Sequence, residues 1–556
     1  MAARAIPMTW RAAPRSFAPA IPLILSLLMA PGTLSAATHT LKDRIDGQTK
    51  LAESPMQNAV GKGALGAIHT FYSKRDYRPL WIENAGLSHR GRALLKVLEN
   101  AAEHGLDPAL FATLKLKDLA SRTDSSSALE LELRMTRAFL DYAVNVSSGV
   151  VENLRKVGGI FRDAKRPQPE KLLADIDTTD DPTGFLGRLP PDTRRYQSLK
   201  LALAQYRQIE QSGGWPTVSN GPTLKAGMKD ARVAQVKRRL RVSGDLNELG
   251  NAELFDDALV VAVKRFQRRH GLKDDGSIGT DTISAMNVPV GERIDQLVIN
   301  LERGRWLDAH LGDRYIYINI ADNDLKLVEK DKTIHAARVV VGKPFHETPV
   351  FSALMTYIEL NPYWNVPNSI AVRELLPKIR ANPGFLSAND YLVLVRSGDN
   401  SSAINPASVD WSNVAQRFPF FLRQKPGAKN ALGSMAFMFP NPHNVFVHDT
   451  PGKNLFNAQD RYFSNGCVRV EFPMKLALLL LAEQDGGRWN EGRIKSIIET
   501  NQPTRIELRN PIPVHITYLT AWADSDGTVQ FRKDLYRRDE ILKRAIREVA
   551  LRGRAR

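Results

Sequence analysis

The stretch "RYIYINIADNDLKLVEKDKTIHAARVVVGK", residues 314–343, changes the hydrophobic period of the chain from helical to alternating. Ile316, Ile318 and Ile320 fall on one face of an extended segment, and the polar turn Ala-Asp-Asn-Asp leads into a second segment. Further alternating runs follow at 355–360, 444–449 and 504–509. Short strands joined by tight polar turns are typical of an all-β sandwich or barrel. We therefore expect a mainly-β domain over residues 313–510.

The sequence before this domain has helical periodicity. Runs such as "GRALLKVLEN" and "ALELELRMTRAFLDYAVNV" place apolar residues at helical spacing, which predicts a helical scaffold domain over 66–211. Residues 222–288 form a smaller unit with three predicted helices, in which Val233, Val236 and Leu240 share one face. The chain is thus expected to be multidomain α+β. The polar segment 38–65 is predicted to be a linker.

Two other segments complete the predicted organisation. Residues 368–440 interrupt the strands with a helix and loops, and an insertion of this size often serves as a lid or substrate wall. Residues 511–556 are predicted to form a hairpin-like strand pair that turns at 525–527, followed by a basic amphipathic helix. We expect both to pack on the β domain.

Length and charge limit the function classes. A chain of 556 residues is too long for one compact core. A formal net charge of +17 indicates an anionic neighbourhood, such as nucleic acid, a membrane surface or an acidic cell-wall polymer. The N-terminus has Arg4, Arg11 and Arg15 before an apolar run, then small residues, which predicts a secretory signal peptide over 1–37. Export weakens the nucleic-acid interpretation.

Cys467 is the one cysteine of the chain, so it cannot form a disulfide within it. An inert buried thiol is the usual fate of a free cysteine. A metal site is disfavoured, because there is no Cys-x-x-Cys or His-x-x-x-His spacing. His443 and His448 precede it in "HNVFVH", where residues five apart on a strand point to opposite faces. We therefore expect only one of them to share a site with Cys467.

The surroundings of Cys467 favour a nucleophile. His448 could take its proton or stabilise the thiolate as an ion pair. Gly466 permits a tight turn, and the backbone N–H groups of Gly466 and Cys467 could stabilise an oxyanion. Arg469, two residues on, would project to the same side and could hold a substrate carboxylate.

Two resemblances add to this interpretation. Residues 222–288 resemble the three-helix peptidoglycan-binding module in Gly244, Phe255-Asp256, Phe266-Gln267 and Asp275-Gly276. His448, followed after fifteen residues by "SNGCVRV", resembles the L,D-transpeptidase signature, with "VGKPFHETPVF" and "NPYWNVP" as supporting segments. With the helical region, the chain resembles the large Gram-negative periplasmic subgroup. One departure is Asn465, since many relatives carry His there.

The resemblance implies a thiol acyltransferase that forms 3→3 cross-links between peptidoglycan stems, with no cofactor and no metal. It implies Cys467 as nucleophile, His448 as proton carrier, Asp449 as the carbonyl that orients His448, and Gly466 as an oxyanion donor. The substrate-binding candidates are Arg469, Asn465, Ser464, Tyr363 and Trp364. Peptidoglycan and other wall-synthesis proteins are the implied partners, in cell-wall biogenesis and cell shape, and carbapenems the implied inhibitors. The alternatives are an L,D-carboxypeptidase or endopeptidase that uses water, and a non-catalytic wall-binding protein.

Overall fold

The structure is a computed structural model that describes residues 40–47, 59–84, 86–162, 164–397, 400–414, 418–482 and 484–554. The chain divides into two units, residues 1–79 and 80–556. In the first unit, residues 40–47 are helical and helix α2 spans Ala59–Lys74. The expected linker over 38–65 is therefore shorter than predicted. The expected signal peptide over 1–37 lies outside the described residues.

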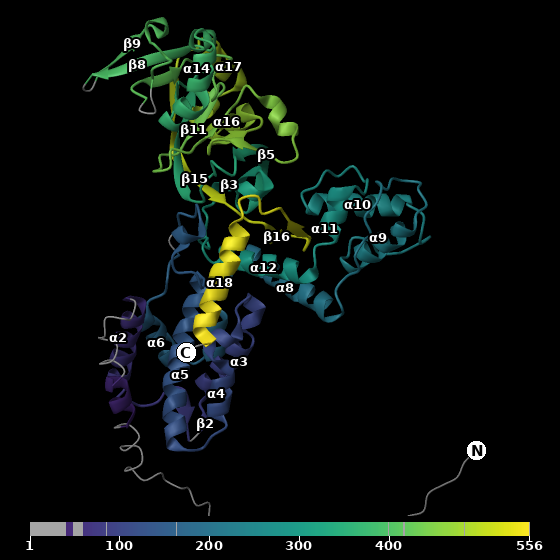
Figure 1. Cartoon of the computed structure of the whole chain (residues 1–556). Helices are drawn as coiled ribbons and strands as arrows, with labels where there is room; N and C mark the ends of the chain where they lie inside the picture. The colour runs from purple at the N-terminus through teal and green to yellow at the C-terminus, as the bar shows by residue number, and fades with distance from the viewer. Residues whose placement is uncertain are drawn as a thin grey trace, which may run out of the picture. The chain divides into compact units, whose positions relative to one another are not determined.

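The second unit begins with a helical region, as predicted from its periodicity (Figure 1). Its longest helix, α5 (Ser125–Ser148), buries most of one side, and Glu132 within it accepts the backbone N–H groups of residues 80–82. This pairing satisfies a carboxylate that has no exposed surface. The other elements are β1 (Ile82–Glu83), β2 (Gly86–Leu87), α3 (His89–Glu99), α4 (Thr113–Ala120), α6 (Pro169–Thr178), α7 (Pro182–Gly187) and α8 (Arg194–Gln211), with 3-10 turns η1 (Ala101–His104), η2 (Pro108–Phe111) and η3 (Leu154–Val157).

The three predicted helices of the smaller unit are present as α9 (Ala231–Val242), α10 (Asp257–Arg269) and α11 (Thr280–Met286). Asp230 and Asp256 cap the first two through their side chains. The predicted inner faces are buried and form one core. Helix α12 (Val290–Gly304), which was not predicted, follows and packs on α8.

The β domain is built on a sheet whose order, among the described residues, is β13-β5-β14-β12-β11-β6-β15-β3-β4. Strand β4 also pairs with β5, so the sheet closes on itself as a barrel. The predicted alternation at 314–343 gives β3 (Arg314–Asn319), β4 (Asp324–Glu329) and β5 (Lys332–Gly342). The other strands are β6 (Ser352–Leu360), β11 (Met435–Met438), β12 (Val447–His448), β13 (Tyr462–Ser464), β14 (Val468–Val470) and β15 (Thr504–Thr517).

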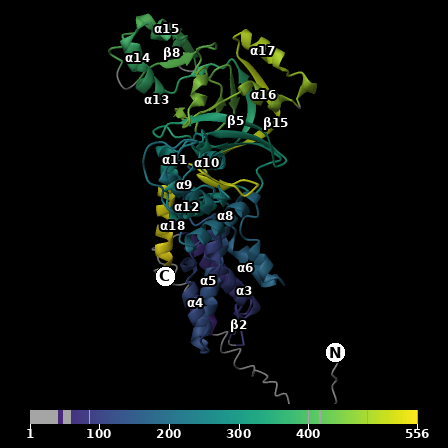
Figure 2. The same ribbon diagram turned by 90° about the vertical axis from the view of Figure 1, so that its right-hand side faces the viewer.

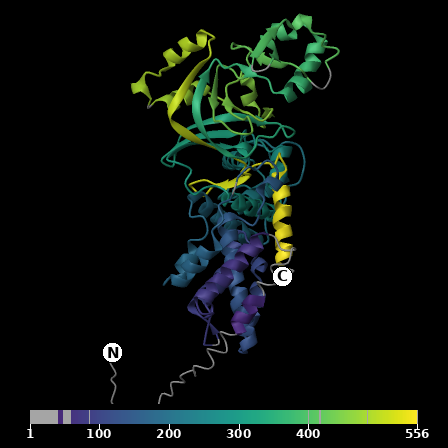
Figure 3. The ribbon, with the colours of Figure 1, turned by 90° about the vertical axis from the view of Figure 1, so that its left-hand side faces the viewer.

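A separate lobe interrupts this sheet. It contains the sheet β7-β10-β8-β9 and helices α13 (Asn368–Ile370), α14 (Leu376–Ala381) and α15 (Phe385–Ala388) around its own core. Its strands are β7 (Trp364–Asn365), β8 (Tyr391–Ser397), β9 (Asn400–Ile404) and β10 (Phe421–Gln424). The expected insertion over 368–440 was too long at its end, because β11 belongs to the barrel. Figures 2 and 3 show this lobe apart from α16 (Pro473–Leu481) and α17 (Glu491–Glu499).

The C-terminal segment differs from the prediction in two ways. Residues 511–517 continue strand β15 and pair with β3 and β6, so the expected boundary at 510 cuts a strand. The hairpin consists only of β16 (Ala521–Ala523) and β17 (Val529–Phe531). Helix α18 (Arg538–Arg554) packs along η2, η3 and α12 (Figure 1). The expected packing on the β domain is therefore wrong for most of the helix, although its first residue, Arg538, contacts Glu347 and Thr348 of that domain.

Candidate active site

Cys467 lies in the tight turn between β13 and β14, two short strands that both pair with β5. Gly466 has a φ of +115°, a backbone conformation that L side chains rarely adopt, so glycine is required for the turn itself. A β-carbon there would meet no atom closer than the Glu347 carbonyl oxygen at 3.8 Å, so the requirement is conformational and not steric. The Cys467 side chain is partly exposed, and its thiol donates to the Asn444 carbonyl oxygen at 3.7 Å.

His448 lies on β12, the strand beside β14. The two strands are parallel, and His448 is in register with Arg469, so these two side chains lie on one face of the sheet. Cys467 precedes Arg469 by two residues. His448 is 4% exposed, and its Nδ1 lies 2.5 Å from the Asp449 carbonyl oxygen. Since a carbonyl only accepts, Nδ1 carries a proton and Nε2 is left as the basic nitrogen.

The Asp449 carboxylate is used elsewhere. It accepts the backbone N–H and hydroxyl of Ser434 at 2.9 Å each and the N–H of Thr450 at 2.7 Å, and it pairs with Lys453. These contacts hold the turn after β12. Asp449 therefore contacts the imidazole through its backbone carbonyl, and its carboxylate is occupied by four donors.

Burial shifts the pKa of both His448 and Cys467 toward the neutral form. Burial, with a smaller contribution from the Arg469 charge, lowers the pKa of His448 to about 4. Burial raises the pKa of Cys467 to about 11, although Arg469 and a backbone hydrogen bond from Phe446 oppose the rise. The lowered imidazole pKa and the raised thiol pKa both oppose a resting ion pair between His448 and Cys467.

Arg469 is in register with His448 and lies two residues after Cys467. Its charge acts on both His448 and Cys467, and burial lowers its own pKa. In the described part of the chain, the buried Arg469 Nε and the Asn465 Oδ1 have no hydrogen-bond partner. Buried polar atoms are rarely left unpaired, so these two distinguish the surroundings of Cys467.

Two of the predicted site groups are already engaged within the turn. Ser464 is 2% exposed, and its hydroxyl donates to the Cys467 carbonyl oxygen at 2.5 Å and accepts the Gly466 N–H at 3.1 Å. The expectation that Ser464 binds substrate is therefore not supported by its position. The Gly466 N–H points at Ser464, so the expected oxyanion role of this N–H is also corrected. Cys467 N–H remains as the backbone donor of the turn.

The other candidates lie outside the turn. Trp364 packs on Tyr391 inside the lobe, with ring centroids 6.2 Å apart, and Tyr363 is 38% exposed beneath Arg423. His443 stacks between Phe161 and Phe351, at 4.2 Å and 4.9 Å. Of the two histidines, His448 is the one in register with the strand that follows Cys467.

Two nearby residues were missed by sequence reasoning. Thr348 donates its hydroxyl to the Gly466 carbonyl oxygen at 2.8 Å. Lys343, whose N–H binds the Ser464 carbonyl, extends its ammonium to Glu374 of the lobe at 3.3 Å. The segment "VGKPFHETPVF" supported the resemblance, but nothing in it identified a role for either side chain.

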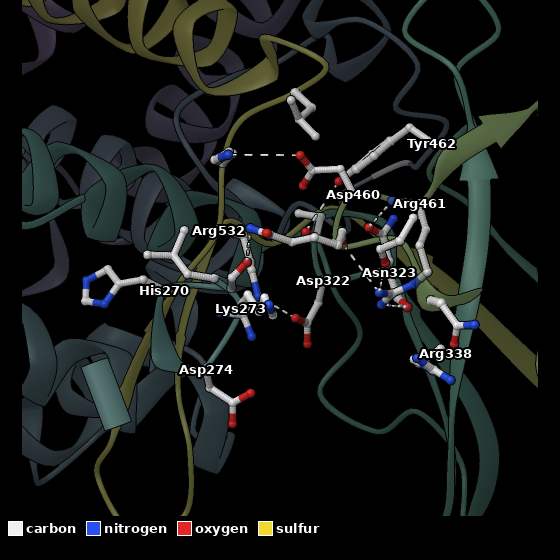
Figure 4. A pocket seen from close by; sticks show the side chains of 18 residues that line it. His270, Lys273, Asp274, Asp322, Asn323, Arg338, Asp460, Arg461, Tyr462 and Arg532 are labelled. Carbon is white, nitrogen blue, oxygen red and sulfur yellow. Dashed lines mark hydrogen bonds and ion pairs between the residues drawn. The ribbon is translucent and has the colours of Figure 1, made fainter. Parts of the chain in front are cut away.

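A cavity of about 430 Å³ lies elsewhere, between the end of α10 and the barrel (Figure 4). Arg532 pairs there with Asp322, and Arg461 donates to backbone carbonyls. Neither Cys467 nor His448 lines this cavity, so the cavity is not part of the cysteine site. Among the described residues, no group of three or more His, Cys, Asp or Glu could hold a metal, and no helix is long and apolar enough to cross a membrane.

Comparison with protein families gives three matches along the chain. Residues 66–203 match the model described as "Scaffold domain", and residues 229–286 match "Putative peptidoglycan binding domain". Residues 313–484 match "L,D-transpeptidase catalytic domain". The last match contains the barrel strands from β3 to β14 and the whole cysteine site.

A curated relative from Haemophilus influenzae, "Putative L,D-transpeptidase", is 34% identical over 251 residues. The match covers 45% of this chain, and the chain spans about half (49%) of that relative. Among solved structures, an L,D-transpeptidase from Xylanimonas cellulosilytica is 13% identical with a TM-score of 0.17, over 54% of this chain and 99% of that one. One from Stackebrandtia nassauensis is 12% identical with a TM-score of 0.21, over 54% and 96%.

Proposed function

We propose that this chain is an L,D-transpeptidase that forms 3→3 cross-links between peptidoglycan stem peptides through a thioester on Cys467, because three matching family models lie along it. The observation that carries the proposal is the register of β12 and β14. It brings His448, oriented by a backbone carbonyl, beside the strand that begins at the cysteine turn. A partly exposed thiol that is activated by a basic nitrogen on the neighbouring strand can perform acyl transfer.

The first half-reaction forms the thioester. The Cys467 sulfur attacks the carbonyl carbon at the L-centre of diaminopimelate, in a tetrapeptide stem, while His448 Nε2 takes the thiol proton. The carbonyl oxygen becomes an oxyanion that the Cys467 N–H stabilises. The C–N bond to the terminal D-Ala then breaks, and His448 returns its proton to the departing amine.

The second half-reaction transfers the acyl group. The side-chain amine of diaminopimelate in a second stem attacks the thioester and gives a proton to His448. The C–S bond breaks, and the sulfur regains that proton as the free thiol. The bond energy of the released D-Ala peptide is conserved in the thioester, so the reaction consumes no nucleotide.

Arg469 and Asn465 are proposed to bind the donor stem. Arg469 Nε and Asn465 Oδ1 are buried polar atoms without a partner in the described chain, one a donor and one an acceptor. A carboxylate next to Arg469 and an amide N–H next to Asn465 would satisfy both. The stem carries both kinds of group.

The lobe that begins at β7 is proposed to limit hydrolysis of the thioester. Glu374 of this lobe reaches Lys343, whose backbone is bonded to the cysteine turn. A lobe held over the site in this way would exclude water while the second stem binds. The smaller helical unit is proposed to hold peptidoglycan near the site, in the periplasm after export, and carbapenems are proposed to acylate Cys467.

The test compares wild type, Cys467→Ala and Cys467→Ser, each incubated with disaccharide-tetrapeptides and analysed by mass spectrometry. We expect cross-linked dimers from the wild type and none from Cys467→Ala. Tripeptide without dimer would instead establish a carboxypeptidase. The absence of any cysteine-dependent product would indicate a wall-binding protein and contradict the proposal.

A further inference from the structure

The segment between β5 and β6 lies directly against the cysteine turn and is fixed to it by Thr348. This side chain has no exposed surface. Its hydroxyl donates to the Gly466 carbonyl oxygen at 2.8 Å and accepts the Gly342 N–H at 2.9 Å. Both hydrogen-bonding functions of the hydroxyl are used, so its orientation is fixed.

The bond from Thr348 orients the proposed oxyanion donor. The Gly466 carbonyl and the Cys467 N–H belong to one planar peptide unit and point in opposite directions, so fixing the oxygen fixes the N–H. An amide that accepts a hydrogen bond at its oxygen also becomes a stronger donor at its nitrogen. On the far side of the turn, Ser464 binds the Cys467 carbonyl oxygen and removes the Gly466 N–H as an alternative donor.

The Thr348 segment is held in turn by the C-terminal part of the chain. The Tyr536 hydroxyl donates to the Gly342 carbonyl and accepts the Thr348 N–H at 3.3 Å. Arg538, whose side chain is 1% exposed, donates to Glu347 at 2.6 Å and 3.1 Å and to the Thr348 carbonyl at 3.1 Å. Arg538 begins α18, which packs on the helical region.

We propose that Thr348 is a positioning residue that aims the Cys467 N–H at the reacting carbonyl oxygen, and that Tyr536 and Arg538 keep Thr348 in place. The proposal rests on the proposed acyl transfer for its biological meaning. It also makes a chemical claim that needs no substrate: the Cys467 N–H can be displaced while the Cys467 thiol stays reactive. This makes the proposal testable with small reagents.

Two reagents distinguish the oxyanion donor from the reactivity of the thiol. p-Nitrophenyl acetate acylates a thiol through a tetrahedral oxyanion, whereas iodoacetamide alkylates it by direct displacement and needs no oxyanion donor. Thr348→Val removes the hydroxyl at nearly constant volume, and Thr348→Ser keeps the hydroxyl. We expect Thr348→Val to slow acylation of Cys467 about 10- to 100-fold, because removing one oxyanion donor outright costs about 100- to 1000-fold. Alkylation is expected to change less than about twofold, and Thr348→Ser to keep both rates.

Tyr536→Phe tests whether Tyr536 keeps Thr348 in place. It also replaces the first test if Thr348→Val does not fold. We expect it to slow acylation by a smaller factor while alkylation is unchanged. Arg537→Gln is the matched control for Arg538→Gln, since the Arg537 side chain is exposed and, among the described residues, bonds only to Glu540. The proposal would be overturned if Thr348→Val and Tyr536→Phe slowed acylation and alkylation equally. It would also be overturned if they slowed neither reaction. A wild type that reacts with the ester but not with tetrapeptide would contradict the proposed function alone.

Discussion

At the scale of single residues, the buried histidine makes stability depend on pH. The pKa of His448 is lowered from 6.5 to about 4, so between these values the unfolded chain binds a proton that the folded chain does not. The free energy of unfolding should therefore fall as pH drops through this window, by about 3 kcal/mol at its lower end. His448→Gln removes this contribution, so its unfolding free energy should fall less steeply between pH 6.5 and 4.

The control for this prediction is His310→Gln, whose side chain is 80% exposed. Urea unfolding at several pH values measures both variants against the wild type. The control should keep the slope of the wild type. An unchanged slope in His448→Gln would contradict the buried, neutral state of this histidine.

Gly466 and Gly527 allow backbone strain to be separated from catalysis. Both have positive φ angles, +115° and +84°. A β-carbon at either position would not clash with any neighbouring atom. Alanine at either position should cost about 1 to 2 kcal/mol of unfolding free energy. Only Gly466→Ala should also reduce cross-linking, by at least about tenfold, because it moves the Cys467 N–H. Equal activities of the two variants would show that the turn tolerates displacement.

A lone thiol, a glycine turn and an upstream histidine form a recognisable pattern, and from this pattern the sequence predicts Cys467 and His448 as site residues. It misassigned Ser464 and the Gly466 N–H, since a hydrogen bond between neighbouring residues of a turn depends on dihedral angles that residue types do not define. Thr348 was missed for a related reason. It lies more than a hundred residues from Gly466, and the pairing of β5 with β13 and β14 brings them together.

At the scale of elements, helix α18 offers a matched pair of leucines. Leu542 has no exposed surface, whereas Leu551 on the same helix is 65% exposed. Leu542→Ala should lower the free energy of unfolding by about 2 to 4 kcal/mol, and Leu551→Ala by less than about 0.5 kcal/mol. Urea unfolding followed by circular dichroism measures both. Similar values for the two would contradict the packing of α18 on the helical region.

The hydrophobic period of the sequence predicted where helices and strands lie better than it predicted what they pack against. Helices α5, α8 and α18 and strands β3 to β5 all occur where the pattern placed them. An amphipathic face shows that a helix packs, but not on what, which is why α18 was assigned to the β domain. The predicted boundary at 510 cut strand β15, which continues through an irregularity between Glu507 and Ile512.

At the scale of the whole molecule, Arg269 joins three segments far apart in the sequence. Its guanidinium pairs with Asp245 in the smaller helical unit and also reaches the Tyr206 hydroxyl of α8 and the Val529 carbonyl of β17, at 3.4 Å and 3.5 Å. Arg269 and Asp245 are both buried. Removing the cation alone would leave the carboxylate without its partner, which typically costs about 3 to 5 kcal/mol.

The corresponding prediction concerns Arg269→Met. Its urea midpoint should fall clearly, and a second substitution, Asp245→Asn, should recover part of the loss because the buried charge is then gone. Arg268→Met is the control, since that neighbouring side chain is 62% exposed. A double variant no more stable than Arg269→Met would show that the pair itself is not what holds the unit in place.

The central claim is that Cys467 carries the acyl group, and the mass of the intact protein tests it most directly. Wild-type protein mixed with excess disaccharide-tetrapeptide and quenched in acid within seconds should gain the mass of the substrate minus D-Ala. Peptide mapping should locate the gain on Cys467, and Cys467→Ala should show no adduct. Release of D-Ala by Cys467→Ala, or a wild-type adduct on any other residue, would contradict the account.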